Sequence, residues 1–477
     1  MKAKYMSMKP KTIALLAGLF CMAGTLHAQA PKGNREVTEW LTDPAHSVFF
    51  TRQPAIARFE PGKDPVNVPI HVDEAKSYQS IDGFGFALTG GSAQHIMRMS
   101  PAARTALLND LFRTDGTHIG ASYLRISIGS SDLNDHTFSY DDMPKGQTDT
   151  GLVHFDLGPD KLDVIPVLKQ ILAIDPHMRI LGSPWSAPVW MKTNGSTIGG
   201  SLRPEYYSVY ARYLVRYIQE MKKHGIPITA ITVQNEPLFG GNNPSMVIPA
   251  EEEGKFIGSA LGPAFRRAKI TTKIIIYDHN CDRPDYPMTI LRDPAAAQYV
   301  DGSAFHLYGG TIDAMSKVHD AFPGKNLYFT EQWVGAPGDF AKDIPEHIQK
   351  LIIGASRNWS RTVIEWNLAS DPNWKPHTDG GCDKCLGAVT IEGDKVTRNP
   401  AYYIIAHAAK FVRPGSVRIA SDMGDSFASV AFRTPQGKIV LVVLSVSGDI
   451  EFRIRYKGSN VTERLPAGAV GTFVWDR

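Results

Sequence analysis

The chain has 477 residues, and its 51 Lys and Arg nearly balance its 48 Asp and Glu, for a formal net charge of +3. Four of those basic residues lie within the first 30 positions, which hold no acidic residue, so the remaining chain carries 47 basic and 48 acidic residues. Such a balance argues against nucleic acid or another polyanion as a partner. The remaining length is too great for one ordinary domain and fits a barrel with a small additional domain.

Residues 1–30 have the pattern of a cleavable secretory signal peptide. Four lysines precede or begin an apolar stretch that runs to Leu26, and Ala28-Gln29-Ala30 matches a small-residue cleavage site. The apolar stretch is too short to span a bilayer, and no later stretch is long and apolar enough to do so. The bulky Phe20 precedes Cys21, which disfavours a lipid anchor at that cysteine. We therefore expect a secreted or periplasmic protein without a membrane span.

The next segment, residues 31–75, is rich in strand patterns. Three short stretches are enriched in β-branched and aromatic residues: Val37–Leu41, Ser47–Arg52 and Val68–Val72. The Pro- and Gly-containing run 61–65 predicts a turn between the last two. These strands form part of a small β-domain in our interpretation.

Residues 76–412 alternate between strand and helix patterns. The predicted strands are Ile81–Ala87, Ser122–Ile128, Arg179–Ser183, Ala230–Gln234, Lys273–Tyr277, Ser303–Leu307, Leu327–Glu331 and Val363–Trp366. The helical patterns are Pro101–Phe112, Pro159–Ile174, Pro204–His224, Glu251–Lys269, Ile312–His319 and Ile344–Asn358. Eight strand–helix units predict an α/β fold, a (β/α)8 TIM barrel with its active site at the carboxyl ends of the strands. The competing fold, a doubly wound open sheet, would call for a glycine-rich dinucleotide fingerprint, which the sequence lacks.

The C-terminal segment, residues 413–477, returns to strand patterns after a helix at Ala401–Val412. The predicted strands are Ser416–Ala420, Phe427–Arg433, Lys438–Ser445, Ile450–Tyr456 and Val470–Trp475. A strand-rich segment cannot continue a ring of helices. We therefore predict an attached β-sandwich domain, formed from these strands and the N-terminal arm at 31–75.

Two predicted barrel strands end in a glutamate. The run Ala230–Gln234 is followed by Asn235 and Glu236, and the run Leu327–Glu331 ends in Glu331. Because the carboxyl ends of barrel strands meet at one mouth, we expect the two carboxylates to lie close together. Two carboxyl groups that lie close together are the catalytic groups with which glycosidases cleave glycosidic bonds.

Aromatic and polar side chains follow other strand ends, as a sugar-binding pocket requires. Trp185 follows the third strand, His306 and Tyr308 end the sixth, and Trp366 ends the eighth. Aromatic faces stack on the C–H face of a pyranose, and polar neighbours bond its hydroxyls. No second histidine or carboxylate stands at ligand spacing from His306, so we do not expect it to bind a metal ion.

Three cysteines follow the predicted signal peptide. Cys382 and Cys385 are three positions apart in a glycine-containing loop, and an exported protein favours a disulfide between them. Two free thiols or half of a metal site are the alternatives, although no second ligand pair with similar spacing appears. Cys281 is then unpaired, and we interpret it as a buried thiol.

Several of these stretches resemble glycoside hydrolase family 30, the family of lysosomal glucosylceramidase. The segment Val233–Pro237 is similar to its acid/base segment, and Leu181–Gly195 is similar to its third-strand signature. Phe329–Glu331 resembles its nucleophile strand, and Trp366–Ala369 resembles the end of its eighth strand. Gly83-Phe84-Gly85 is similar to its first strand.

The resemblance implies a retaining β-glucoside hydrolase with Glu236 as acid/base and Glu331 as nucleophile. It also implies that Asn235 bonds the sugar 2-hydroxyl and that Asn373 is a further pocket residue, beside the aromatic residues named above. We expect no cofactor, and we expect a monomer.

Two departures from glucosylceramidase favour a β-1,6-linked glucan as the substrate. Gly90 stands where the resemblance to lysosomal glucosylceramidase implies a sugar-binding aspartate, and its lack of a side chain predicts room for a further sugar. The cysteine-bearing loop from Thr378 resembles microbial members, including β-1,6-glucanases. Glucosylceramide or another β-glycoside is the alternative substrate, and a non-catalytic carbohydrate-binding barrel is a different class of function. Both glutamates are present, which argues against the latter.

Overall fold

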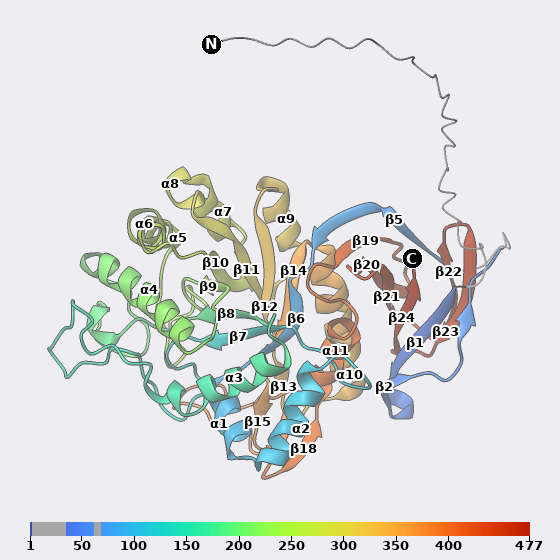
Figure 1. Cartoon of the computed structure of the whole chain (residues 1–477), viewed down its shortest axis with the longest axis horizontal. Helices are drawn as coiled ribbons and strands as arrows, with labels where there is room; N and C mark the ends of the chain where they lie inside the picture. The colour runs from blue at the N-terminus through green and yellow to red at the C-terminus, as the bar shows by residue number, and fades with distance from the viewer. Residues whose placement is uncertain (2–34, 62–67) are drawn as a thin grey trace.

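The computed structural model describes Met1, residues 35–61 and residues 68–477. The predicted signal peptide and most of the predicted turn at 61–65 lie outside the described residues. Figure 1 shows two parts, a barrel surrounded by helices and a sandwich of strands beside it. Within the described ranges, no helix is long and apolar enough to cross a membrane.

Eight strands form the predicted closed barrel, in the order β10-β11-β12-β14-β6-β7-β8-β9, and every adjacent pair is parallel. Their bounds are β6 Gly83–Ala87, β7 Tyr123–Ser127, β8 Arg179–Ser183, β9 Ala230–Thr232, β10 Lys273–Cys281, β11 Val300–Gly310, β12 Asn326–Glu331 and β14 Ser360–Glu365. The predicted TIM barrel is therefore confirmed. The main difference is that β10 and β11 extend beyond their predicted ends, toward the mouth.

Helices surround the barrel, between its strands (Figure 1). They are α1 Gly90–Arg98, α2 Pro101–Phe112, α3 Val164–Ile174, α4 Tyr207–Lys223, α5 Ala250–Phe256, α6 Gly262–Ala268, α7 Asp285–Arg292, α8 Pro294–Ala297, α9 Ala314–Ala321, α10 Phe340–His347 and α11 Pro400–Ala409. Wider π-helical turns, η5 Ile257–Leu261 and η6 Ile348–Ala355, join α5 to α6 and extend α10. Helix α2 has its predicted limits because Ser100 caps it, accepting a hydrogen bond from the Ala103 amide, and Pro101 occupies its first position.

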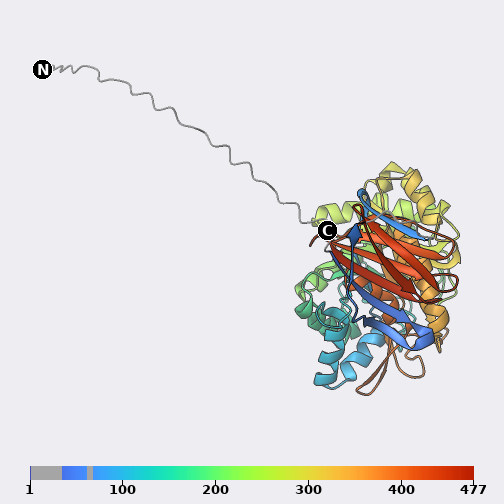
Figure 2. The same ribbon diagram turned by 90° about the vertical axis from the view of Figure 1, so that its right-hand side faces the viewer.

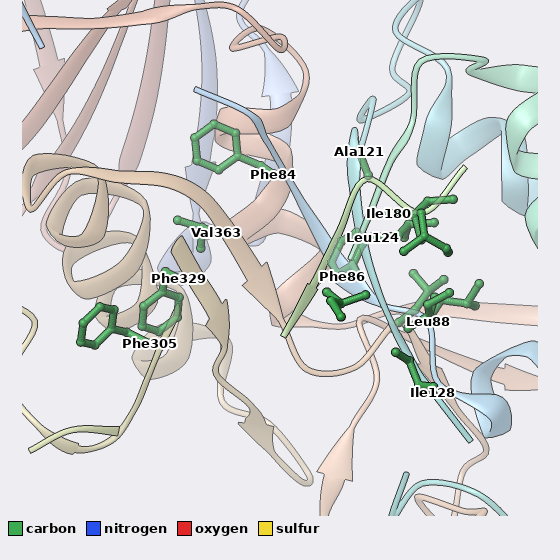
Figure 3. Close-up of a cluster of buried hydrophobic side chains, with 14 of the residues drawn as sticks. Phe84, Phe86, Leu88, Ala121, Leu124, Ile128, Ile180, Phe305, Phe329 and Val363 are labelled. Atoms are coloured by element: carbon green, nitrogen blue, oxygen red, sulfur yellow. The ribbon is translucent and has the colours of Figure 1, made fainter. Parts of the chain in front are cut away.

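Side chains of each barrel strand alternate between two cores. Those that point outward pack against the helices, and Figure 3 shows part of this cluster, with Phe86 and Leu124 beside Ile180 and with Phe305 beside Phe329. Those that point inward fill the barrel with one buried layer: Tyr123, Leu181, Ala230, Ile275, Ala304, Tyr328 and Ile364. The barrel interior is therefore packed and not a pore.

The β-domain combines both ends of the described chain, as predicted. Its strand order is β2-β1-β24-β21-β20-β19-β5-β22-β23-β4, with β3 paired to β1, and Figure 2 looks onto its face. The N-terminal strands are β1 Glu36–Asp43, β2 Val48–Arg52, β3 Ala57–Arg58, β4 Glu60–Pro61 and β5 Pro69–Ser80. The C-terminal strands are β19 Val417–Ser421, β20 Phe427–Arg433, β21 Lys438–Ser445, β22 Ile450–Tyr456, β23 Ser459–Leu465 and β24 Val470–Asp476.

Strand β5 connects the two faces of this domain. It pairs antiparallel with β19 and parallel with β22, and it continues to Ser80, well beyond the predicted end at Val72. Strand β23 was not predicted, because its sequence SNVTERL is mostly polar and only alternate positions are buried. Its apolar residues Val461 and Leu465 complete the sandwich core.

Short strands complete the loops at the barrel mouth. They are β13 Val334–Gly335 paired with β16 Cys385–Leu386, and β15 Ala369–Ser370, which forms a small sheet with β17 Val389–Glu392 and β18 Lys395–Arg398. The pairing of β13 with β16 holds the cysteine-bearing loop against the end of β12.

Candidate active site

A second inward-facing layer lies nearer the carboxyl ends of the strands, and it is polar. Two residues beyond the apolar layer, six of the eight strands contribute a side chain with a donor or acceptor, within the strand or just after its end: Arg125, Ser183, Thr232, His306, Thr330 and Trp366. The alternation of strand side chains places this second layer directly above the first. The barrel mouth is therefore lined with hydrogen-bonding groups instead of apolar ones.

Strand β10 breaks the alternation and thereby contributes Asp278 to the polar layer. Its pairing with β11 shifts between Tyr277 and His279, so that Asp278 is an extra residue. Tyr277 and Asp278 have φ values of 75° and 54°, a left-handed conformation that is costly for residues with a side chain. Such bulges redirect a side chain at barrel rims. Here the bulge turns the carboxylate of Asp278 into the barrel.

The two predicted glutamates meet at this mouth. One oxygen of Glu236, one oxygen of Glu331 and one ring nitrogen of His306 all lie within 4.8 Å of one another. Glu331 is buried at the end of β12, while Glu236 follows β9 with a φ of 45°, another strained backbone position. This spacing is close to that of retaining glycosidases and much shorter than that of inverting ones.

Arg125 is fully buried in β7 and holds several of these side chains. Its guanidinium donates to Glu331 Oε2 at 2.5 Å, and to Asn235 Oδ1 and Asp278 Oδ2 at 2.7 Å each. The guanidinium carbon also lies 4.8 Å from the ring centre of Trp185. A rigid, always charged fork suits such multiple contacts. Arg125 thus fixes Asn235 beside the carboxylate of Glu331.

His306 lies between the buried acids, and this differs from its predicted position in the pocket. One ring nitrogen, Nδ1, is 3.1 Å from Glu236 Oε1, and the other, Nε2, is 3.1 Å from Asp278 Oδ1. Nδ1 also lies 3.6 Å from Glu331 Oε1. The ring is completely buried and does not line the cavity. His306 therefore contacts the carboxylates and not the space available to a substrate.

The charges at the mouth shift the pKa values of these groups. Burial raises the pKa of Glu236, but the neighbouring rings of His279 and His306 outweigh it and lower the pKa to about 2. Burial lowers the pKa of His306, but Glu331, Asp278 and Glu236 together raise it to about 9. Burial raises the pKa of Glu331, against the opposing charges of His306 and Arg125. The two opposite shifts favour a proton on His306 over one on Glu236.

A cavity of about 170 Å³ opens in front of the two glutamates. It is lined by Asp132, Trp185, Asn235, Glu236, Asn242, Tyr308, Glu331, Trp333, Trp366, Cys382 and Cys385. Trp185 and Trp366 stand side by side, with ring centres 5.4 Å apart. Burial and the charge on Glu331 raise the pKa of Asp132 to about 6. Aromatic walls with a few polar groups suit a sugar ring.

Cys382 and Cys385 form a disulfide, and both residues line the cavity wall. The backbone amide of Cys382 donates to Asp132 Oδ2 at 3.2 Å. The disulfide packs with Trp185, Trp333 and Trp366 in one apolar cluster. Cys281 is free and buried.

The donor atoms at the mouth do not suit a metal centre. Among the described residues, Glu236, His306 and Glu331 are the group whose ligand atoms come close enough to hold an ion. Both nitrogens of His306 already bond carboxylates, and the Arg125 guanidinium already bonds Glu331. A metal ion in that space would be repelled by the Arg125 guanidinium. We therefore interpret Glu236, His306 and Glu331 as groups that exchange protons with one another and not as metal ligands.

The structure brings most, but not all, of the predicted pocket residues together. Asn235, Trp185, Tyr308 and Trp366 line the cavity with the glutamates, and the Tyr308 hydroxyl donates to Glu331 Oε1 at 3.0 Å. Asn373 does not lie there: it is exposed, in a turn whose amide donates to Asp371, and it does not line the cavity.

The room predicted at Gly90 is also absent. Gly90 is the first residue of α1, and a Cβ there would lie 2.0 Å from the amide nitrogen of Asn134. The missing side chain is therefore replaced by Asn134, and the expectation that Gly90 opens space for a further sugar is wrong.

Arg125, Asp132 and Asp278 were not predicted from the sequence, nor were the cavity-lining Asn242 and Trp333. Arg125 interrupts the apolar run Tyr123–Ser127, and a charge inside a buried strand is rarely there without a partner. Asp278 follows the apolar run at 274–277, the same signal that indicated Glu331. Asp132 lies in a loop, and its sequence context carries no comparable signal.

Comparisons with known proteins agree with this geometry. The family profile of the glycosyl hydrolase family 30 TIM-barrel domain matches residues 81–412, and that of the family 30 beta sandwich domain matches residues 415–473. The chain is 36% identical to an endo-1,6-beta-D-glucanase of Neurospora crassa, over 82% of this chain and 86% of the relative. It is 28% identical to the lysosomal acid glucosylceramidase of Mus musculus, over 84% and 82% respectively.

A solved structure, that of the endo-beta1,6-glucanase BT3312, superposes with a TM-score of 0.86 at 34% identity and covers 93% of this chain and 99% of its own. The barrel, the paired carboxylates at its mouth and the attached sandwich are thus found together with the family's sequence pattern. The chain belongs to glycosyl hydrolase family 30 and is a glycoside hydrolase.

Proposed function

We propose that this protein cleaves β-1,6-linked glucan with retention of configuration, through a glycosyl-enzyme on Glu331. The observation that supports the proposal most strongly is the approach of the Glu236 and Glu331 oxygens to within 4.8 Å, beside an aromatic cavity. An inverting enzyme needs a gap of about 6.5–9.5 Å, to admit a water between its carboxyl groups.

In the first half-reaction, Glu331 attacks the anomeric carbon while Glu236 protonates the departing oxygen. Arg125 and the Tyr308 hydroxyl hold the two oxygens of Glu331, so that its orientation toward the cavity is set before a substrate binds. Arg125 also occupies the carbonyl oxygen of Asn235, so the amide nitrogen is the atom with which Asn235 binds the sugar 2-hydroxyl. This contact strengthens as the transition state forms.

In the second half-reaction, Glu236 removes a proton from water, which attacks the glycosyl-enzyme and releases the sugar. The same carboxylate can act first as acid and then as base because the charge of Glu331 is lost in the ester and returns at hydrolysis. Trp185 and Trp366 supply the aromatic wall for the sugar ring, and Asp132 is a carboxylate available to its hydroxyls.

The substrate proposal depends on the family relatives and on the disulfide loop. The two comparisons with the higher identities, at 36% and 34%, are with enzymes named for β-1,6-glucan, and the glucosylceramidase of Mus musculus is at 28%. The Cys382–Cys385 disulfide and Trp333 form one wall of the cavity. Such a rigid wall suits a defined linkage to a following sugar better than a flexible lipid.

Glucosylceramide is the second candidate, since the family contains glucosylceramidases. Comparison of kcat/KM on β-1,6-gluco-oligosaccharides and on detergent-dispersed glucosylceramide separates the two. We expect a clear preference for the oligosaccharides. A preference for the lipid would overturn the substrate proposal and leave the chemistry intact.

Proton NMR of the first-formed product tests the reaction itself. We expect a β-anomer from a β-linked substrate, followed by slow mutarotation. An initial α-anomer would show inversion and would remove Glu331 as nucleophile.

We further propose that residues 1–30 are cleaved as a signal peptide, so that the enzyme is secreted or periplasmic, and that it acts as a monomer. The charge and cleavage-site pattern of residues 1–30 supports export. We keep the domain limits 31–75, 76–412 and 413–477 as proposals. N-terminal sequencing of the exported protein and its mass in solution test these points.

A further inference from the structure

A single buried carboxylate, that of Asp278, connects most of the polar groups at the barrel mouth. Oδ2 accepts hydrogen bonds from Arg125 at 2.7 Å, Ser183 Oγ at 2.8 Å and Thr232 Oγ1 at 2.7 Å. Oδ1 accepts from Thr330 Oγ1 at 2.6 Å and lies 3.1 Å from His306 Nε2. Asp278 thus contacts five other barrel strands but does not line the cavity.

The surrounding donors favour the ionised form of Asp278 in the folded protein. A fully buried carboxylate is stable as an anion only where donors and cations surround it. Burial raises the pKa of Asp278, but Arg125, His306 and Thr330 outweigh it and hold the pKa well below its usual range. Besides His306, four groups donate hydrogen bonds to this carboxylate: Arg125, Ser183, Thr232 and Thr330. A proton on Asp278 itself would compete with these donors.

Ionised Asp278 determines the protonation of His306. Because Asp278 Oδ1 can only accept, His306 Nε2 must carry a proton. His306 Nδ1 faces Glu236 Oε1 and, farther away, Glu331 Oε1, which are also acceptors when ionised. A ring with acceptors at both nitrogens is most stable as an imidazolium.

Other ionisable groups face or neighbour His306 from the strands packed around it. The acids facing the ring are Asp278 on β10, Glu331 on β12 and Glu236 after β9, and the cation of the same cluster is Arg125 on β7. His279 Nδ1 lies 3.7 Å from the same oxygen of Glu236, and the Tyr308 ring centre lies 6.1 Å from that of His306. Three acids against one guanidinium leave a net negative charge, which favours a proton on His306.

We propose that Asp278 is a positioning residue which keeps His306 in the imidazolium form, and that His306 supplies the proton which Glu236 gives to the leaving oxygen. This inference rests on the acid/base role proposed for Glu236. The proton moves from His306 Nδ1 to Glu236 Oε1 and then to the glycosidic oxygen, whose bond to the anomeric carbon breaks as Glu331 forms the ester. In hydrolysis, water gives one proton to Glu236 and its oxygen joins the anomeric carbon, while the bond from that carbon to Glu331 breaks and Glu331 leaves as a carboxylate. The proton then returns from Glu236 to His306.

The Asp278→Asn variant removes the negative charge while keeping the shape of the side chain. His306 then loses an anion that raises its pKa, so the alkaline limb of kcat/KM moves to lower pH, by one unit or more. On β-1,6-gluco-oligosaccharides we expect kcat to fall by about 10²-fold, because general acid catalysis is lost. On a dinitrophenyl β-glucoside, whose leaving group needs no proton, the fall is at least tenfold smaller.

Thr330→Val is the matched control. It removes one hydrogen bond to Asp278 Oδ1 but leaves the charge, so the alkaline limb keeps its position even if stability falls. A limb that stays at the wild-type pH in Asp278→Asn, or a loss of equal size on both substrates, would overturn the proposal. So would a limb that moves equally in both variants, since a structural disturbance would then suffice.

Nitrogen NMR of the wild-type protein with labelled imidazole rings tests the proposal without relying on the folding of Asp278→Asn. His306→Gln identifies the signals of this ring by their loss. We expect both ring nitrogens to carry protons at pH 7, and a neutral ring would overturn the inference. Failure of the proposed function gives a different result: the wild-type protein would cleave no β-glucan, or Glu331→Gln would remain active.

Discussion

The two ends of the barrel both contain buried ion pairs, but they are constructed differently. At the amino ends of the strands, Asp82 lies 2.7 Å from Arg179 and 2.7 Å from Arg361. Lys273 is 3.9 Å from Asp82 and 3.4 Å from Asp301. Three cations thus surround two carboxylates, and the side chains of Arg179 and Lys273 remain about one-third exposed.

At the mouth the balance is reversed, because the acids outnumber the permanent cation. Arg125, Asp278 and His306 have no exposed side-chain surface, and the carboxylates of Glu236 and Glu331 are nearly buried. At the amino ends of the strands, the positive charges of partly exposed side chains neutralise Asp82 and Asp301. No proton is needed to balance the charge there. At the mouth, a proton on His306 offsets part of the remaining negative charge. The catalytic cluster therefore differs from the structural one in two ways. It has more buried carboxylates than permanent cations, and it lies next to a cavity.

The largest effect should come from the nucleophile at the mouth. Glu331→Gln should lower kcat by about 10⁴-fold or more on every substrate, because no covalent intermediate can form. Glu236→Gln is the comparison: it should keep the first half-reaction on aryl glucosides with activated leaving groups. Added azide should then restore turnover and yield a β-glycosyl azide. Steady-state rates on glucan and aryl substrates measure both, and equal losses without rescue would contradict the assigned roles.

Removal of a charge at the amino ends of the barrel strands should lower the stability of the protein. It should not change the pH dependence of its activity. Asp82→Asn removes the carboxylate that pairs with Arg361 and Arg179, and loss of such charge-assisted hydrogen bonds to partly exposed cations costs about 2 kcal/mol in the free energy of unfolding. Urea denaturation measures the loss, and kcat/KM of the folded fraction is then followed against pH. A shifted limb in this variant would mean that the two ends are electrically coupled and would weaken the distinction drawn above.

His407 extends the comparison to a buried group without an ionic partner. It lies in α11 against the sandwich, and its nitrogens contact the hydroxyls of Thr42 and Thr472. Burial lowers its pKa to about 3. Below about pH 6.5, His407 therefore binds a proton in the unfolded chain but not in the folded protein. The free energy of unfolding falls as the pH drops from about 6.5 toward 3.

Between pH 8 and pH 5, this residue should lower the free energy of unfolding by roughly 2 kcal/mol. Denaturation at both pH values, in the wild type and in His407→Gln, isolates its share. If His407→Gln keeps the full pH dependence of the free energy of unfolding, then burial between the barrel and the sandwich does not keep His407 neutral.

The smallest effect should come from the disulfide at the mouth. Replacing Cys382 and Cys385 together by serine opens a loop of only four residues, which costs at most about 2 kcal/mol in unfolding free energy. We expect KM for gluco-oligosaccharides to rise about threefold while kcat stays near that of the wild type, because the wall moves and the carboxylates do not. A large fall in kcat would place this loop among the parts that orient Glu236 or Glu331. Cys281→Ser, which leaves the disulfide intact, is the control.

Local sequence was sufficient for much of the barrel and for its two glutamates. An apolar β-branched run that ends in an acid identifies a buried parallel strand and the end at which its side chain emerges, and Glu236 and Glu331 both follow this rule. Helix α2 is equally local, since Ser100 and Pro101 mark its start. Both signals depend on neighbours within a few positions, and sequence order alone supplies those.

Other features were decided only by contacts between distant segments. Asp278 faces inward because β10 slips by one residue against β11, and no pattern within β10 predicts that slip. Strand β23 is mostly polar and becomes a strand by pairing with β22. Gly90 is filled by Asn134, which is 44 positions away, and Asn373 is left in an exposed turn.

The sequence therefore determined which residues have the chemistry, since an acid at a strand end keeps its meaning in any barrel. The tertiary structure decided how those residues are charged. Glu236, His306 and Asp278 come from different strands, and their proton is distributed by distances of about 3 Å that exist only after the barrel closes.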